Sequence, residues 1–333
     1  MSSVGSRASL LGAPPLTTLI NSMLAWRAPG GRRARLSILI YHRVLPEPDP
    51  LRPGEPDVAR FRWQMRLLAR HFRPLPLAEA IERLRTDRLP ARSVCVTFDD
   101  GYADNATLAL PILREYAIPA TVFIATAFLD GGRMFNDTLI ESVRRLPDGP
   151  CDLTALGLGP RTLRTTQDRL VLIRELIGQV KYRPQPERDE WARRLSTRVP
   201  TPLPDDLMLR RDQVRALHAA GIDIGAHTFS HPILARLDDA EAHREIARGA
   251  TELTELLGAC PRLFAYPNGR PGQDYHDRHV ALVRALGFAA AVSTAWGVAT
   301  RASDPYQLPR FTPWDRTPAR FLLRLARNLG TAR

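Results

Sequence analysis

Two short motifs carry side chains whose types and spacing suit a metal centre. Residues 227–231 place His227 and His231 four positions apart, so one helical turn presents both imidazoles on the same side. Asp99 and Asp100 are adjacent carboxylates, which repel each other unless one of them binds a cation. Two histidines and one carboxylate around a divalent ion leave positions open for water and substrate. Together the motifs favour a metal site, although each alone is also consistent with an ordinary turn or with surface histidines.

A lone histidine and a tight turn complete the candidate residues. His42 directly follows an apolar run at 36–41, where a single histidine is usually structural. Residues 267–269 read Pro-Asn-Gly, a turn that can aim backbone N–H groups into a site. Both features become functional candidates if the fold brings them to the two metal-binding motifs.

Each of these polar clusters follows a segment with the pattern of a buried strand. The predicted strands are continuous apolar runs at 36–41, 93–98, 120–125, 222–226, 263–266 and 288–292. Helical patterns separate them, and one begins at a capping box of Asp238 with Glu241 and stops at Gly258. This alternation predicts an α/β fold, and the number of strands favours a barrel over a small open sheet. The carboxyl ends of barrel strands converge, which would bring the clusters together.

The barrel pattern covers about residues 36–315 and is interrupted once. Between about 130 and 209, amphipathic helices flanked by loops rich in Pro and Gly predict a helical insertion on the barrel rim. Its first residues, Phe135, Asn136 and Asp137, are candidates to line a substrate groove. Residues 316–333 predict a C-terminal helix.

The first 35 residues read as an amphipathic segment followed by a linker. Leu19, Met23 and Trp26 recur at helical spacing, and no small-residue cleavage site follows the apolar stretch. We expect this helix to pack on the body of the protein, with peripheral membrane contact aided by nearby arginines as the alternative. A cytoplasmic or membrane-peripheral location is therefore favoured over secretion.

Composition restricts the possible partners and compartments. The 333 residues contain 47 Lys+Arg against 35 Asp+Glu, a net charge of +12, yet Lys181 is the only lysine. An arginine excess spread along the chain indicates a composition bias rather than a nucleic-acid-binding face, so no nucleic-acid partner is expected. Hydrophobic residues make up 44% and charged residues 25%, as in ordinary globular proteins. Three cysteines do not make a disulfide framework.

Four segments carry a resemblance to one family. They read VTFDDG at 96–101, HTFSH at 227–231, FAYPNG at 264–269 and LIYHRV at 39–44. In this order they resemble the motifs of the polysaccharide deacetylases, the NodB-homology carbohydrate esterases, in the form found in the exopolysaccharide-associated branch. The resemblance extends over about residues 36–311.

The resemblance implies a distorted (β/α) barrel and a metal-dependent carbohydrate deacetylase. The substrate would be an acetylated polysaccharide or its precursor, N-acetylated in the first instance, in the synthesis or modification of exopolysaccharide or cell-wall glycan. Asp99 would be the general base, and one divalent ion, expected to be zinc, would be bound by Asp100, His227 and His231. The metal would lower the pKa of a bound water, and Asp99 would take its proton. Substrate and oxyanion contacts would fall to Tyr266 and Asn268.

Two departures from the family pattern bear on activity. Many members carry an arginine that orients the base in the third motif, where this chain has Ala265. Many also supply the general acid from a late Leu-x-His motif, where this chain reads Leu308-Pro309-Arg310. The resemblance to the exopolysaccharide branch assigns the acid role to His42 instead, with an ordering or sugar-contacting role as its alternative.

Two other functions remain open for the whole chain. A catalytically impaired carbohydrate-binding relative would show such departures, although the intact Asp99, Asp100, His227 and His231 argue against it. A basic protein that binds anionic polymers would need arginines clustered on one face.

Overall fold

Seven strands form a nearly closed parallel barrel in the computed structural model, which describes residues 14–331. Hydrogen-bonded neighbours follow the order β1, β3, β4, β7, β8, β9, β10, and every pair on this path is parallel. The bounds are β1 (Ser37–Tyr41), β3 (Ser93–Phe98), β4 (Ala120–Ile124), β7 (Asp223–Ala226), β8 (Leu263–Ala265), β9 (Ala290–Trp296) and β10 (Leu308–Arg310); β2 (Arg73–Pro74) pairs with β3 at the edge.

The last strand meets the first. Phe311, directly after β10, donates its N–H to the Ile38 carbonyl at 2.7 Å, and the Ile40 N–H donates to the Phe311 carbonyl at 3.0 Å. This single bridge nearly closes the sheet into a barrel, which leaves little of the open edge that a flat sheet would expose. The predicted distorted (β/α) barrel is thereby confirmed.

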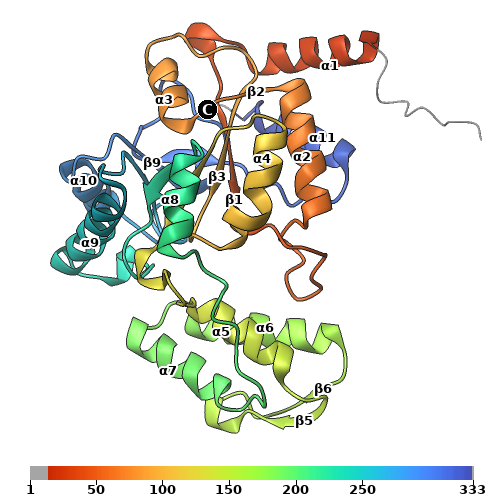
Figure 1. Cartoon of the computed structure of the whole chain (residues 1–333), viewed down its shortest axis with the longest axis vertical. Helices are drawn as coiled ribbons and strands as arrows, with labels where there is room; N and C mark the ends of the chain where they lie inside the picture. Colours follow the sequence, from red (N-terminus) through yellow and green to blue (C-terminus); the bar gives the residue numbers. More distant parts are fainter. Residues whose placement is uncertain (1–13, 332–333) are drawn as a thin grey trace, which may run out of the picture.

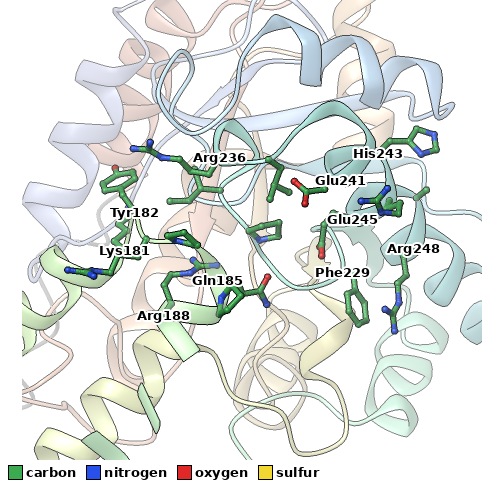
Figure 2. Close-up of a pocket in the computed structure, with 18 of the residues that line it drawn as sticks. Lys181, Tyr182, Gln185, Arg188, Phe229, Arg236, Glu241, His243, Glu245 and Arg248 are labelled. Atoms are coloured by element: carbon green, nitrogen blue, oxygen red, sulfur yellow. The ribbon is translucent and has the colours of Figure 1, made fainter. Parts of the chain in front are cut away.

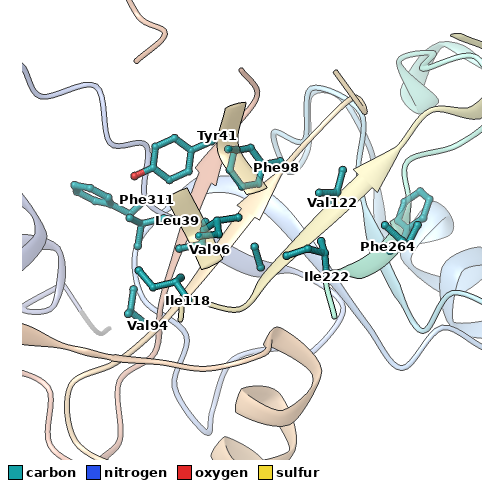
Figure 3. Packing of buried hydrophobic residues seen from close by; sticks show 14 of the residues in the cluster. Leu39, Tyr41, Val94, Val96, Phe98, Ile118, Val122, Ile222, Phe264 and Phe311 are labelled. Atoms are coloured by element: carbon teal, nitrogen blue, oxygen red, sulfur yellow. The ribbon is translucent and has the colours of Figure 1, made fainter. Parts of the chain in front are cut away.

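The strands are apolar along their whole length because both of their faces are covered. All residues of β1, β3 and β4 are buried, as parallel strands require when helices pack outside and side chains fill the inside. Figure 3 shows the packed cluster around these strands, in which Tyr41 and Phe98 stack with ring centres 5.5 Å apart. Burying each large side chain contributes about 1.5–3 kcal/mol, so this cluster rigidly supports the strand ends.

Helices surround the barrel, as Figure 1 shows. They are α2 (Val58–His71), α3 (Leu77–Arg85), α4 (Leu110–Glu115), α8 (Arg211–Ala219), α9 (Asp239–Leu257), α10 (Asp277–Ala285) and α11 (Pro318–Asn328). The predicted start and end of α9 are confirmed: Asp238 and Glu241 form a reciprocal capping box, and Gly258 follows in the left-handed region at φ 74°.

The segment predicted as a rim insertion lies below the barrel in Figure 1. It contains α5 (Phe135–Arg145), α6 (Thr166–Val180) and α7 (Gln185–Ser196) around an apolar core of its own. It also contains a two-stranded antiparallel sheet, β5 (Gly149–Asp152) with β6 (Pro160–Leu163), that the helical pattern did not predict. Arg52 ties α5 to the barrel side through ion pairs to Asp137 at 2.8 Å and Glu141 at 3.2 Å.

Helix α1 (Pro14–Arg27) lies at the opposite end of the molecule from the insertion (Figure 1). It packs through the buried Leu24, whereas Leu19, Met23 and Trp26 are 67%, 51% and 78% exposed. The three residues that mark the amphipathic pattern therefore face away from the body of the protein. Within residues 14–331, no helix is long and apolar enough to cross a membrane.

Candidate functional site

The predicted polar clusters meet at the carboxyl ends of four barrel strands. His42 follows β1, Asp99 and Asp100 follow β3, His227 follows β7, and Asn268 lies three residues beyond β8. A cleft of about 670 Å³ lies between the barrel and the insertion. Four of the candidate residues line it: His42, Asp100, His231 and Asn268. The convergence expected of a parallel barrel thus assembles the site from distant parts of the chain.

Asp100, His227 and His231 form a cluster that fits a divalent metal ion. One ligand atom from each lies within 4.8 Å of the others, and Asp100 Oδ1 is 3.4 Å from His227 Nε2 and 3.3 Å from His231 Nε2. The Ala265 carbonyl, which only accepts, is 2.7 Å from His227 Nδ1. Nδ1 of His227 therefore carries the proton and Nε2 keeps its lone pair for a metal, an arrangement typical of ligating histidines.

The charge states of these residues suit the same role. Burial lowers the pKa of His231 to about 3 although the Asp100 carboxylate acts in the opposite direction, so its imidazole is neutral near pH 7. Burial of Asp100 opposes ionisation, but the neighbouring histidines outweigh it and hold the pKa of that carboxyl well below its usual range. Neutral imidazole and ionised carboxylate are the forms that bind a divalent ion.

Backbone conformations that most residues avoid shape the loops of the site. Asp100, Thr228, His231 and Asn268 have φ of 76°, 64°, 55° and 58°, in the left-handed region. For residues other than glycine such conformations cost about 1–3 kcal/mol each and persist where the surroundings impose them. The Thr228 hydroxyl supports the loop, because it donates to the His227 carbonyl at 2.5 Å and accepts from the His231 N–H at 3.1 Å.

Asp99 is buried and held by an arginine that we did not predict. The Arg310 guanidinium donates to both oxygens of Asp99 at 2.7 Å and also to the Ser293 carbonyl at 2.8 Å. Asp99 is 2% and Arg310 1% exposed. Burial disfavours ionisation of Asp99, yet Arg310 and the nearby histidines outweigh this effect and lower its pKa. Asp99 is therefore a carboxylate of fixed orientation that keeps a free lone pair on each oxygen.

Arg310 is the functional residue that sequence reasoning missed. The family pattern places a histidine near 308–310 and the orienting arginine at position 265, where this chain has Ala265, buried in β8. No predicted strand precedes Arg310, so the signal that marked Asp99 and His227 is absent there. In β10, Leu308 and Arg310 are both buried while Pro309 is not.

His42 lines the cleft at the end of β1, and its surroundings favour the protonated imidazole. The Asn105 side-chain amide donates to the His42 carbonyl at 2.9 Å, and Asp104 accepts from the Val44 N–H at 3.0 Å, so the segment is pinned. Burial opposes protonation, but the carboxylates of Asp100 and Glu55 outweigh it and raise the pKa of His42. Glu55, a second cleft residue without a sequence signal, faces the site from the loop before α2.

Of the two residues expected to contact substrate, Asn268 lies at the cleft and Tyr266 lies in the core. Asn268 lines the cleft, and among the described residues its N–H has no hydrogen-bond acceptor. Tyr266 is fully buried, its ring stacks 3.8 Å from that of Tyr275, and its N–H donates to the Val292 carbonyl at 3.3 Å. The Tyr266 side chain therefore lies in the core beside Tyr275 and is not among the residues that line the cleft.

The insertion supplies the opposite wall of the cleft. Leu170, Ile173 and Ile177 on α6 form an apolar stretch, and Asn136 on α5 adds a polar group. Of the three residues proposed at the start of the insertion, Asn136 lines the cleft, whereas Asp137 is buried in the ion pair with Arg52. The insertion therefore shapes the space in front of the Asp100, His227 and His231 cluster.

The fold and the site together describe a parallel (β/α) barrel that carries a candidate metal cluster and an arginine-held aspartate at the carboxyl ends of its strands. The family model for polysaccharide deacetylases matches residues 86–291. YxkH of Bacillus subtilis (strain 168), whose name assigns it to the polysaccharide deacetylases, is 35% identical over 278 residues, covering 83% of this chain and 71% of YxkH. The chain belongs to the polysaccharide deacetylase family, hydrolases that act on N-acetyl groups of carbohydrates.

Solved structures support the same fold. The deacetylase PplD of Streptococcus pyogenes, solved in complex with acetate, matches with a TM-score of 0.59 and 19% identity, over 88% of this chain and 98% of PplD. IcaB from Ammonifex degensii matches with a TM-score of 0.57 and 20% identity, over 91% of this chain and 99% of IcaB. The resemblance inferred from the four motifs is confirmed.

Proposed function

We propose that this protein is a metal-dependent deacetylase that releases acetate from an N-acetylated polysaccharide or its precursor. The observation that carries the proposal is the Asp-His-His cluster directly beside an aspartate whose two oxygens are both held by Arg310. The proposed divalent ion is zinc, because two imidazoles and one carboxylate suit it and leave positions open.

The chain's own residues account for the proton transfers of amide hydrolysis. A divalent ion bound by Asp100, His227 and His231 would polarise the acetyl carbonyl and lower the pKa of a water. Asp99 accepts a proton from the attacking water as the water oxygen bonds to the acetyl carbon. His42 donates its proton to the amide nitrogen as the C–N bond breaks, so acetate and a free amine leave. The N–H of Asn268 is available to the carbonyl oxygen.

The alternative of a catalytically impaired carbohydrate-binding relative loses its main argument. That alternative rested on the missing arginine at position 265 and on the missing late histidine. Arg310 supplies a guanidinium to the base from β10, and His42 faces the cleft from β1. These two residues support the assignment of an oriented base and of an acid to this chain.

Metal removal and two histidine variants test the proposal. With N-acetylglucosamine oligomers, the protein should release acetate, lose this activity on chelation and regain it with added zinc. His231→Ala should lose bound metal. The loss in metal affinity should exceed the about 10–100-fold that follows when a residue hydrogen-bonded to a metal ligand is removed, because His231 is itself an expected ligand. His42→Ala should keep its metal while its rate falls about 10²–10⁴-fold.

Metal content by atomic emission and acetate release by enzymatic assay are the two measurements. Chelator-resistant acetate release would contradict the metal mechanism. Equal metal loss in both variants would make His42 a ligand rather than the acid. Metal binding with no acetate release from any acetylated glycan would favour the carbohydrate-binding alternative.

We also propose a setting in exopolysaccharide or cell-wall glycan synthesis or modification, at the cytoplasmic side or at a membrane surface. The setting is supported by the motifs at 39–44 and 264–269. The peripheral contact is supported by the exposed Leu19, Met23 and Trp26 of α1 together with the cationic end of that helix.

Vesicle binding tests the membrane contact. In cosedimentation with anionic phospholipid vesicles, Trp26→Ser should reduce the bound fraction, because Trp26 contributes apolar area at the interface. Trp296→Ser is the matched control, since Trp296 is also exposed but lies on the barrel. Equal binding of all three proteins, or binding by none, would reject a contact through α1.

A further inference from the structure

A second cavity, of about 910 Å³, lies beside the catalytic cleft between α7 and α9. The loop 227–233 separates the two spaces: His231 lines the cleft, whereas Phe229 and Pro232 line the second cavity. In Figure 2, Arg188 and Gln185 approach from α7, and Glu241 and Glu245 approach from α9. The two spaces therefore share this loop as a common wall.

Arg188 is the unusual residue of this cavity. Its side chain is buried, with 5% of the residue exposed, and among the described residues its Nε has no hydrogen-bond partner. No carboxylate within residues 14–331 forms an ion pair with it, and its guanidinium contacts the Phe135 ring at 4.9 Å. The two other buried arginines, Arg52 and Arg310, each pair with a carboxylate at 2.7–2.8 Å.

A buried guanidinium without a carboxylate is costly. Taking a charge out of water costs several kcal/mol unless a counter-charge and hydrogen bonds replace the hydration. Burial accordingly lowers the pKa of Arg188, and the charge of the adjacent Asp189 compensates only in part. The N–H donors of its guanidinium therefore lack the carboxylate that a planar guanidinium binds best.

The rest of the lining carries more basic groups without an ion pair than carboxylates, so an excess of positive charge remains beside the two glutamates. Three further basic residues of the cavity have no ion pair among the described residues: Lys181, Arg236 and Arg244. The two carboxylates already accept hydrogen bonds: Glu245 from the Ser230 N–H at 2.8 Å and hydroxyl at 2.7 Å, and Glu241 from the Asp238 N–H at 3.1 Å. They hold the loop and the helix cap, and they remain able to accept from sugar hydroxyls.

We propose that this cavity is a subsite for an acidic glycan, in which Arg188 binds a carboxylate or phosphate of a sugar unit away from the reacting acetyl group. The inference rests on the proposed function, because it treats the occupant as part of a glycan. Charge-assisted hydrogen bonds from the guanidinium bind the anion. Gln185 and Glu245 offer amide and carboxylate oxygens to sugar hydroxyls.

Binding of tetragalacturonate to the metal-loaded protein tests the subsite. This probe carries a carboxylate on every unit and no acetyl group, so no turnover occurs, and titration calorimetry measures its Kd. Arg188→Gln should weaken binding about 10–100-fold, the loss expected for hydrogen bonds to a charged group. Arg193→Gln on the same helix is the control, because Arg193 is exposed and pairs with Glu190; it should bind as the wild type does.

Further measurements separate the possible outcomes. Arg236 is exposed and lines the cavity, so Arg236→Gln should weaken binding several-fold without affecting folding. This variant tests the subsite if Arg188→Gln fails to fold. If inorganic phosphate displaces tetragalacturonate, or if only phosphate binds, the group that Arg188 binds on the glycan would be a phosphate rather than a carboxylate. Unchanged affinity in both variants, equal affinity for neutral cellotetraose, or no binding of either anion would overturn the subsite. Because the probe is not a substrate, these results are independent of acetate release.

Discussion

Asp99→Asn is expected to lower kcat for acetate release by about 10²–10⁴-fold, the contribution of a positioned general base. The asparagine amide has nearly the shape of the carboxylate but does not accept a proton from water near neutral pH. The metal should be retained, because Asp99 is not part of the Asp100, His227 and His231 cluster. The measurement is steady-state acetate release at saturating N-acetylated oligosaccharide, with metal content determined on the same samples.

A matched substitution separates catalysis from the loss of a buried ion pair. Asp315 is also a buried aspartate paired with an arginine, Arg324, at 2.6 Å, and it does not line the catalytic cleft. Asp315→Asn should therefore cost stability with little change in kcat. If the two variants lost activity to the same extent, Asp99 would be a structural residue rather than the base.

Arg310→Met is expected to destabilise the protein by about 3–5 kcal/mol at pH 7, because it leaves the Asp99 charge buried without its partner. Methionine fills much of the same volume, so the loss is chiefly electrostatic. Urea unfolding followed by circular dichroism gives the free energy. Combining Arg310→Met with Asp99→Asn should cost less than the sum of the two single changes, since the second removes the uncompensated charge. Additive losses would mean that the pair is not coupled.

The same variant should change the dependence on pH. Burial alone favours protonated Asp99, and Arg310 is the main group that outweighs it. In the wild type the folded-state pKa lies below the unfolded value of about 3.9, so the stabilisation is present above that pH and is lost as pH falls. Without Arg310 the pKa rises, so the variant loses stability as pH rises past about 4. The acidic limb of kcat/KM should move to higher pH; an unmoved limb would exclude Asp99 as the base.

The barrel and most of the site could be predicted because their signals are local. Buried parallel strands are continuous apolar runs, and 93–98 matches β3 at both ends. Residues placed directly after such runs, such as Asp99, His42 and His227, must gather at one end of the barrel whatever the details of packing.

Features set by contacts between distant segments could not be predicted. Arg310 pairs with a residue 211 positions away, and only the closure of the barrel makes them neighbours. Tyr266 follows an apolar strand just as His42 does, yet stacking on Tyr275 turns its ring into the core. The lack of a carboxylate partner for Arg188 depends on which distant residues surround it in the fold, which no local pattern of helix α7 reveals.

Closure of the barrel at its last strand has a consequence for synthesis of the chain. A ribosome releases the metal-binding motifs at 96–101 and 227–231 well before residues 308–311 emerge. Until then β1 has no partner on one side and Asp99 has no guanidinium, so a nascent or truncated chain holds its ligands without an oriented base. The orientation of Asp99 therefore depends on the C-terminal part of the chain, which completes the ring of strands last.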